Sequence, residues 1–222
     1  MAFDKNNFCW ISFPNGIQKF DGKNFTIVPV QPCLPYVKQV FVFQRKNGDL
    51  LVSHSQGISK YEINNNLFRQ VYTFHSGEKR TALFIGEDEN IVYFYHSTGK
   101  ISGMDCRTYK PVSETNTSFP DYSSNIDFRP KFSDNIINHK AAMLVNHILY
   151  LWDLQKGKSL SQSVPVAGIS WSFLRLKTEN EVLYYDHTPA NALQLYNFAS
   201  GTNAPLFVKG KDDKFIYLCA IF

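Results

Sequence analysis

The chain alternates apolar and polar residues with a period of two, in short runs that end at Gly, Asn or Asp. Residues 10–22, WISFPNGIQKFDG, contain two such runs, with one turn at Gly16 and a second at Gly22. A period of two is typical of β-strands, and glycine supplies the positive φ that tight turns need. The segment therefore predicts strand, turn, strand, turn.

The same pattern returns 41 positions later, in residues 51–63, LVSHSQGISKYEI, where Gly16 falls on Gly57 and Phe20 on Tyr61. The stretch before this copy, KQVFVFQ followed by RKNGD, adds an apolar strand and an Asn-Gly turn. The stretch after it, NNNLFRQVYTF, adds a polar turn and another strand. One repeat unit is therefore predicted to contain four short strands.

Weaker copies of the unit follow in residues 81–105, 141–160 and 169–198. The third strands are predicted to end at positions separated by 41, 43, 48 and 44 residues, namely Phe20, Tyr61, Met104, Trp152 and Tyr196. Five units at this period predict an all-β fold, a β-propeller of about five four-stranded antiparallel blades in which each blade covers its neighbour's apolar face. A sandwich or another all-β array is the alternative.

The repeat pattern does not decide whether the propeller is complete. Residues 1–222 form either a single propeller domain or a propeller fragment. At the start, DKNNFCW aligns with a first-to-second-strand turn, so that only MAF precedes it as a strand. The last residues, KFIYLCAIF, form an apolar run. This run either returns to complete the first blade and close a small ring, or the chain is a slice of a larger propeller. A slice is expected to self-associate through its open blade edges.

The first two copies resemble the two-component-regulator propeller repeat. The matching residues are Trp10, Ile11, Asn15, Gly16, Ile17, Phe20, Asp21 and Gly22 in the first copy, and Gly57, Ile58 and Tyr61 in the second. Ser12-Phe13 and Ser53-His54 depart from the small Gly-Thr pair of that repeat. The resemblance implies a non-enzymatic, ligand-binding sensor region of hybrid two-component systems, mainly of Bacteroidetes. It also implies a periplasmic location, a carbohydrate ligand and a parent kinase as partner.

A second resemblance is carried by LYLWDL, residues 149–154, which is similar to the third strand of a WD repeat but lacks the companion Gly-His dipeptide. It implies an intracellular protein-interaction scaffold, and this alternative stays open beside the sensor.

Five of the six histidines map to one face of the predicted propeller. His54, His96, His147 and His187 fall in second-to-third-strand turns, and His75 falls in an interblade connection on the same face. We predict a ligand-binding face there, which also contains Tyr95 and Tyr185. Imidazoles can bind anionic ligands or respond to pH, and aromatic rings pack against sugars. The alternative is that polar turns simply collect histidine and that Tyr95 packs between blades.

Composition and motifs exclude several function classes. The net charge is +4, and the 23 basic residues are scattered, so no nucleic-acid partner is predicted. No apolar run is long enough to span a membrane, and no leader pattern is visible, which predicts a cytoplasmic location if the chain is complete. We predict no enzyme, cofactor or metal, because no acid–base, phosphate-loop or metal motif occurs. The disulfide status of the cysteines stays open; they are Cys9, Cys33, Cys106 and Cys219.

Overall fold

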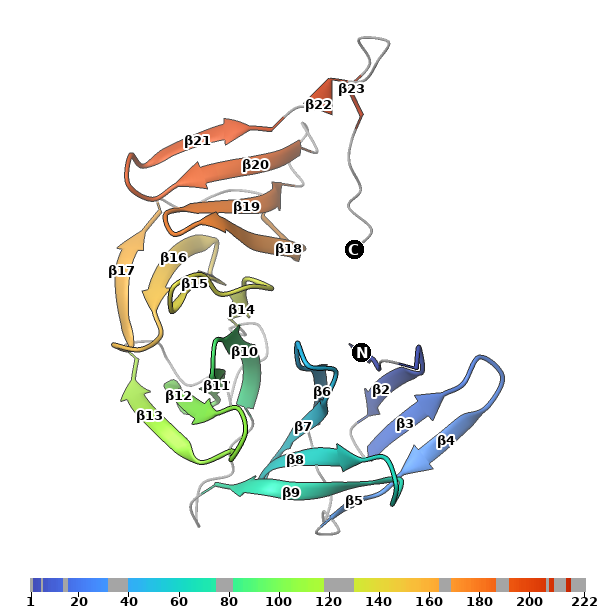
Figure 1. Cartoon of the computed structure of the whole chain (residues 1–222). Coiled ribbons are helices and arrows are strands. Elements are labelled where there is room, and N and C mark those ends of the chain that lie inside the picture. The colour runs from blue at the N-terminus through green and yellow to red at the C-terminus, as the bar shows by residue number, and fades with distance from the viewer. Residues whose placement is uncertain are drawn as a thin grey trace. The chain divides into compact units, whose positions relative to one another are not determined.

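The structure is a computed structural model in which every regular element is a strand (Figure 1). It describes residues 2–4, 6–13, 16–31, 40–74, 82–117, 130–163, 169–186, 192–206, 208–209 and 215–216. These residues contain no helix. They form five antiparallel sheets of four consecutive strands, called blades 1 to 5 here in chain order. The chain divides into two compact units, Met1–Ile126 and Asp127–Phe222, and each is described by itself.

The first unit contains blades 1 to 3. Blade 1 consists of β1 (Ala2–Phe3), β2 (Cys9–Phe13), β3 (Gly16–Phe20) and β4 (Phe25–Val28). Blade 2 consists of β6 (Phe41–Gln44), β7 (Leu50–His54), β8 (Gly57–Glu62) and β9 (Leu67–Thr73). Blade 3 consists of β10 (Ala82–Asp88), β11 (Ile91–His96), β12 (Lys100–Asp105) and β13 (Pro111–Asn116). After blade 1 the chain also adds a short strand, β5 (Val30–Gln31), which pairs parallel with β9 (Figure 1).

The second unit contains blades 4 and 5. Blade 4 consists of β14 (Lys131–Phe132), β15 (Lys140–Val145), β16 (Ile148–Asp153) and β17 (Lys158–Gln162). Blade 5 consists of β18 (Ile169–Thr178), β19 (Glu181–Asp186), β20 (Ala192–Asn197) and β21 (Thr202–Pro205). A separate two-stranded ribbon follows, made of β22 (Val208–Lys209) and β23 (Phe215–Ile216).

The predicted repeat is confirmed at the level of single positions. Each of the five predicted third-strand ends lies at the end of a third strand or one residue before it. The next residue accepts hydrogen bonds that close the following turn, as Asp21 does from the backbone N–H groups of Lys23 and Asn24 at 2.8 and 2.7 Å. The same position is occupied in the other blades by Glu62, Asp105, Asp153 and Asn197. A polar side chain that caps the turn is therefore part of the repeat.

Apolar faces of successive blades pack against each other within each unit. Between blades 1 and 2, Trp10 and Ile17 are fully buried with Val52 and Phe68. The Trp10 ring meets those of Tyr61 and Phe68 edge-on, with centroids 4.6 and 5.6 Å away. Corresponding apolar clusters lie between blades 2 and 3 and between blades 4 and 5. A single four-stranded sheet cannot bury both of its faces, and this packing is what makes the repeat stable.

Two sequence questions concern residues that the structure describes only in part. Of the apolar run KFIYLCAIF, β23 pairs with β22 and the last six residues lie outside the described residues, so ring closure stays an open prediction. Cys9 and Cys106 are free thiols, whereas Cys33 and Cys219 lie outside the described residues.

Substitution of Gly16 and Gly57 tests why the repeat requires glycine at the start of the third strand. Both have a φ near 155°, at 153° and 156°, which L-residues rarely adopt. A Cβ on Gly57 would lie 1.9 Å from the Tyr72 carbonyl oxygen, whereas one on Gly16 meets no described atom within 4 Å. We expect Gly16→Ala to lower the free energy of unfolding by about 1–3 kcal/mol through backbone strain, and Gly57→Ala to lower it clearly more. Urea denaturation of the two variants measures this difference, and equal losses would contradict it.

Candidate functional site

The structure describes three of the five histidines of the predicted face, and of these only His147 lies within a second-to-third-strand turn as predicted. His54 and His96 are the last residues of the second strands β7 and β11, and His147 lies in the turn between the second and third strands of blade 4. His75 and His187 lie outside the described residues. The three described side chains differ in exposure, because His54 and His96 are buried and His147 is exposed.

His54 is held by hydrogen bonds inside blade 2. The Gln56 backbone N–H donates to Nδ1 at 3.3 Å, so the ring proton resides on Nε2 and is donated to Ser59 Oγ at 2.8 Å. Burial lowers the pKa of His54 to about 4, and the ring is therefore neutral at physiological pH. His96 forms the matching contact in blade 3, with Nε2 2.6 Å from Ser102 Oγ. Both rings thus link a second strand to a third strand.

The two tyrosines of the predicted face also differ. Tyr95 is buried in β11, and Tyr185 in β19 is half-buried. Among the described members of the predicted face, His147 and Tyr185 are therefore the most accessible to a ligand. Whether this face binds a ligand stays a prediction.

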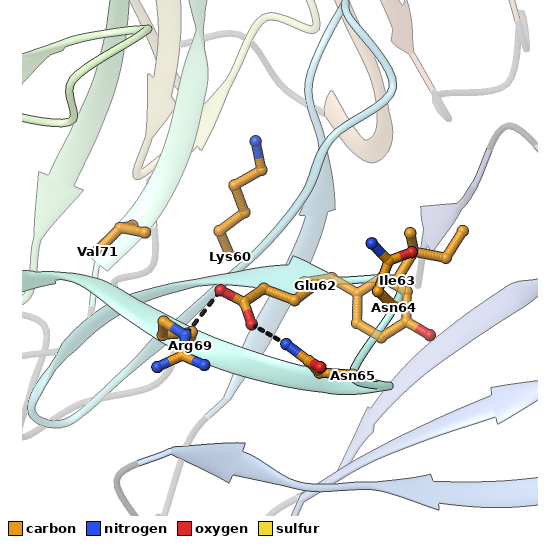
Figure 2. Close-up of a pocket in the computed structure, with 8 residues that line it drawn as sticks. Lys60, Glu62, Ile63, Asn64, Asn65, Arg69 and Val71 are labelled. Atoms are coloured by element: carbon orange, nitrogen blue, oxygen red, sulfur yellow. Dashed lines mark hydrogen bonds and ion pairs between the residues drawn. The ribbon is translucent and has the colours of Figure 1, made fainter.

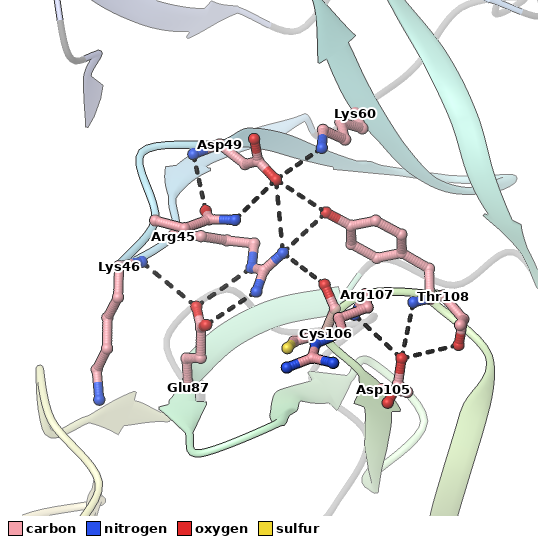
Figure 3. A network of polar contacts seen from close by, with 11 residues as sticks. Arg45, Lys46, Asp49, Lys60, Glu87, Asp105, Cys106, Arg107 and Thr108 are labelled. Carbon is pink, nitrogen blue, oxygen red and sulfur yellow. Dashed lines mark hydrogen bonds and ion pairs between the residues drawn. The ribbon is translucent and has the colours of Figure 1, made fainter.

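A buried charge network that the sequence analysis missed connects blades 2 and 3 (Figure 3). Arg45, in the first hairpin of blade 2, forms a bidentate pair with Glu87 of β10 at 3.2 and 2.8 Å. Its Nη1 donates to the Cys106 carbonyl oxygen at 2.7 Å and to the Tyr109 hydroxyl oxygen at 2.9 Å. Lys60 reaches the rim of the network through an ion pair with Asp49 at 2.7 Å.

In this network Arg45 keeps its positive charge and Tyr109 stays uncharged. Burial alone would lower the pKa of Arg45, but the hydrogen bonds to Glu87 and Tyr109 outweigh it and raise that pKa above its usual value. Burial raises the pKa of Tyr109, so its hydroxyl stays protonated. Arg45 is only 4% exposed. The arrangement is a clamp between blades and offers no group for acid–base catalysis near neutral pH.

The second unit contains a related connection between blades 4 and 5. The Asn135 side chain bonds the backbone of Leu176 twice, through its amide N–H to the carbonyl oxygen at 2.9 Å and through its oxygen to the N–H at 2.8 Å. Lys140 pairs with Glu179 at 2.6 Å. Polar contacts at the first hairpins therefore reinforce apolar packing in both units.

A solvent-facing hollow lies beside the last hairpin of blade 2 (Figure 2). It has a volume of about 550 Å³, and its lining residues come from β8, β9 and the turn between them. They are Lys60, Tyr61, Glu62, Ile63, Asn64, Asn65, Arg69 and Val71. The lining combines two cations, one carboxylate, two amides and apolar side chains, which suits recognition more than bond-breaking chemistry.

Charge in the hollow is arranged around Glu62. Its carboxylate accepts from Arg69 Nε at 2.7 Å and from the Asn65 amide at 2.8 Å (Figure 2). The Arg69 hydrogen bond lowers the pKa of Glu62, so the carboxylate is ionised and does not supply a proton at neutral pH. The Arg69 side chain and Ile63 are each 57% exposed, so the hollow presents an exposed guanidinium on β9 and an exposed apolar side chain in the turn between β8 and β9.

Sequence reasoning had only weak signals for these features. Arg45 stands in RKNGD, which the pattern identifies correctly as a turn, and nothing local indicates that its partners are 42 and 64 residues away. Three residues that line the hollow, Asn64, Asn65 and Arg69, belong to the run NNNLFR, which the pattern identifies only as a turn followed by a strand. A charged residue flanked by apolar runs in the first hairpin was the available clue.

Two further findings concern only the part of the chain that the structure describes. It contains no cluster of three or more His, Cys, Asp or Glu side chains that could hold a metal ion. It also contains no helix long and apolar enough to cross a membrane.

Comparisons with known proteins support the fold. No family model and no curated protein matches the sequence. Among solved structures, a chain of the mitotic checkpoint complex is similar, with a TM-score of 0.60 and 12% identity over 91% of this chain and 62% of that chain. The WD40 domain of Pan2 from Neurospora crassa has a TM-score of 0.56 and 11% identity over 91% and 63% of the two chains. BamB from Moraxella catarrhalis has a TM-score of 0.54 and 11% identity over 90% and 61%.

The predicted β-propeller fold is thereby confirmed. At 11–12% identity the similarity concerns the fold alone. This chain spans less than two thirds of the length of each of the three proteins.

The buried His54 generates a pH prediction. The unfolded chain binds a proton at this residue near pH 6.5, whereas the folded chain does so only near 4. The free energy of unfolding is therefore expected to fall as pH drops from about 6.5 towards 4, with a His54 contribution of at most about 3 kcal/mol. His54→Gln should remove that part of the pH dependence, and the exposed control His147→Gln should keep it. Urea denaturation at pH 7.5, 6 and 5 measures the slope; an unchanged slope in His54→Gln would reject the assignment.

The charge clamp generates a double-mutant prediction. Arg45→Met leaves Glu87 buried without its guanidinium and is expected to lower the free energy of unfolding by about 3–5 kcal/mol. Arg45→Met combined with Glu87→Met removes the unpaired charge, so the double variant should be more stable than Arg45→Met alone. Urea denaturation of the four proteins gives the coupling energy. Losses that simply add would show that the two residues do not act as a pair.

Proposed function

We propose that this chain is a non-enzymatic protein-interaction propeller and that the hollow of blade 2 binds an acidic, extended segment of a partner protein. The observation that carries the proposal is that this hollow is lined by both an exposed guanidinium, that of Arg69, and an exposed apolar side chain, that of Ile63. A guanidinium recognises carboxylates through paired hydrogen bonds, and a neighbouring apolar side chain adds contact area.

The charges of the hollow agree with an acidic partner. Its lining contains Lys60 and Arg69 against one carboxylate, Glu62. The described hydrogen bond of Arg69 uses Nε, and Figure 2 shows its two terminal nitrogens without a drawn partner. These nitrogens form the fork that a peptide carboxylate would meet. The Asn64 and Asn65 amides line the same hollow, and amides suit the polar backbone of an extended peptide.

The same geometry argues for binding without catalysis. Glu62 is ionised and already bonded to two side chains, so it is unsuited to act as a general acid at neutral pH. The WD40 domain and the checkpoint-complex chain that share this fold are compatible with a role in protein interaction. A binding propeller is therefore the function that the site supports best.

The second candidate is the carbohydrate sensor that the two-component-regulator resemblance implies, with a periplasmic location and a parent kinase. Two observations favour it. Trp10, Ile11, Gly16, Ile17 and Phe20 of the motif lie in the second and third strands of blade 1. The hollow combines Tyr61 with two amides that could bind sugar hydroxyls. Tyr61 nevertheless packs on Trp10 and donates its hydroxyl proton to Asn66, which leaves little of the ring for a sugar.

The proposal predicts selective binding of acidic peptides. On an array of 12-residue peptides, we expect binding to sequences that contain Asp or Glu next to Leu or Ile, and no binding to their lysine-substituted counterparts. Arg69→Gln should weaken binding about tenfold or more, because a charged hydrogen bond is lost. Arg175→Gln is the matched control: Arg175 is also exposed and paired with a carboxylate, Asp134 at 3.4 Å, but lies in the other unit.

Fluorescence anisotropy with the best labelled peptide gives the dissociation constants. Equal weakening by the two arginine variants would mean that only net charge matters and would reject the hollow as the site. A glycan array run in parallel separates the candidates, since binding to sugars without binding to acidic peptides would favour the sensor.

A further inference from the structure

Blade 1 has an apolar face that no other part of the described structure buries. In an antiparallel sheet, directly paired residues lie on the same face. Cys9 pairs with Phe20, and Phe20 with Phe25; Ile11 pairs with Gln18, and Gln18 with Ile27. The face therefore contains Phe3, Cys9, Ile11, Phe13, Gln18, Phe20, Phe25 and Ile27, and is called the blade 1 outer face.

This face is exposed and uncharged. Phe3, Phe13, Phe25 and Ile27 are 51, 41, 58 and 72% exposed, and no residue of the face is buried. Phe20 and Phe25 stack with ring centroids 4.5 Å apart. The opposite face of the same sheet is the one that packs on blade 2 through Trp10.

Blade 5 has a comparable face. Val182, Tyr184 and Tyr196 are buried against blade 4. The alternate residues lie on the other face, where Leu183 pairs with Leu195, Tyr185 with Leu193 and Leu195 with Ala204. The blade 5 outer face is defined by Arg175, Glu181, Leu183, Tyr185, Leu193, Leu195, Asn197, Thr202 and Ala204, of which none is buried.

The two outer faces have opposite orientations in the repeat. Trp10 in blade 1 and the equivalent Leu51 in blade 2 both point towards the next blade, whereas Leu50 and Val52 point towards the previous blade. The blade 1 outer face, which includes Ile11, is therefore a face that receives a previous blade. The blade 5 outer face lies away from blade 4 and is a face that receives a next blade.

We propose that the chain self-assembles head to tail, with the blade 5 outer face of one copy stacked on the blade 1 outer face of a second copy. This contact repeats the blade-on-blade packing already present within each unit. The repeat supports a second copy as the occupant, because one face receives a previous blade and the other a next blade. Both faces present apolar side chains, and the charged residues Arg175 and Glu181 both belong to the blade 5 outer face. A contact between two different surfaces is heterologous and leads to rings or open chains. The proposal goes beyond partner binding at the hollow and does not depend on it.

The test uses one variant for each face. Ile27→Lys blocks the blade 1 outer face and Leu195→Lys blocks the blade 5 outer face. The unmodified chain is expected to form concentration-dependent oligomers between about 1 and 100 μM in sedimentation velocity and light scattering, and each variant alone should be a monomer. A mixture of the two variants should give a dimer and nothing larger, because one intact face remains on each partner.

Controls keep the outcome decisive. Val112→Lys replaces an exposed apolar residue of β13 outside both faces and should leave the oligomers unchanged. If Leu195→Lys fails to fold, as judged by circular dichroism, Ala204→Lys blocks the same face from an exposed position. A monomeric unmodified chain, or a mixture that stays monomeric, overturns the proposal. Oligomers that persist in Leu195→Lys but not in Ile27→Lys would also overturn it and indicate pairing of two blade 1 faces.

Discussion

The constraint that governs this molecule is that a four-stranded sheet with apolar side chains on both faces cannot exclude water by itself. Blade 2 shows this directly, because Val52 packs towards blade 1 and the adjacent Leu51 packs towards blade 3. Neighbouring residues of one strand thus belong to two different cores. Each blade depends on the blades before and after it, and the repeated sequence is a consequence of that dependence.

The local part of this organisation could be predicted from the sequence, since strands, turns and the period are recorded in neighbouring residues. Alternation identified the strands, and Gly16, Gly57 and the Asn-Gly pair of RKNGD identified turns. The contacts between blades could not be predicted in the same way. Arg45 bonds Glu87 and Tyr109, which are close to it only after two hairpins and a connection have folded. Such a pair has no periodic signature in a single sequence.

The histidines show that the repeat indicates where a residue lies along the chain but not the environment of its side chain. The repeat predicts His54, His96 and His147 in second-to-third-strand turns, whereas His54 and His96 are the last residues of second strands. The direction of a side chain depends on a single residue of register. In both cases Nε2 of the ring lies within hydrogen-bond distance of a serine hydroxyl on the adjacent third strand. His147 lies two residues after the end of its second strand, β15, within the turn itself, and is exposed. The same residue type at nearly the same repeat position therefore has opposite environments.

The separation of faces from hairpins also explains how one propeller can carry two kinds of interaction. Sheet faces are flat and apolar, so they suit another sheet, whereas the hairpins are polar and contain the charged pairs, such as Glu62 with Arg69. The hollow of blade 2 is built from the hairpin between β8 and β9 and includes no residue of either outer face. Stacking of blades and binding at the hollow would therefore use different elements. Stacking would be driven by burial of apolar surface, and binding at the hollow by charged hydrogen bonds. Salt should weaken the second far more than the first, because exposed charges are screened and apolar burial is not.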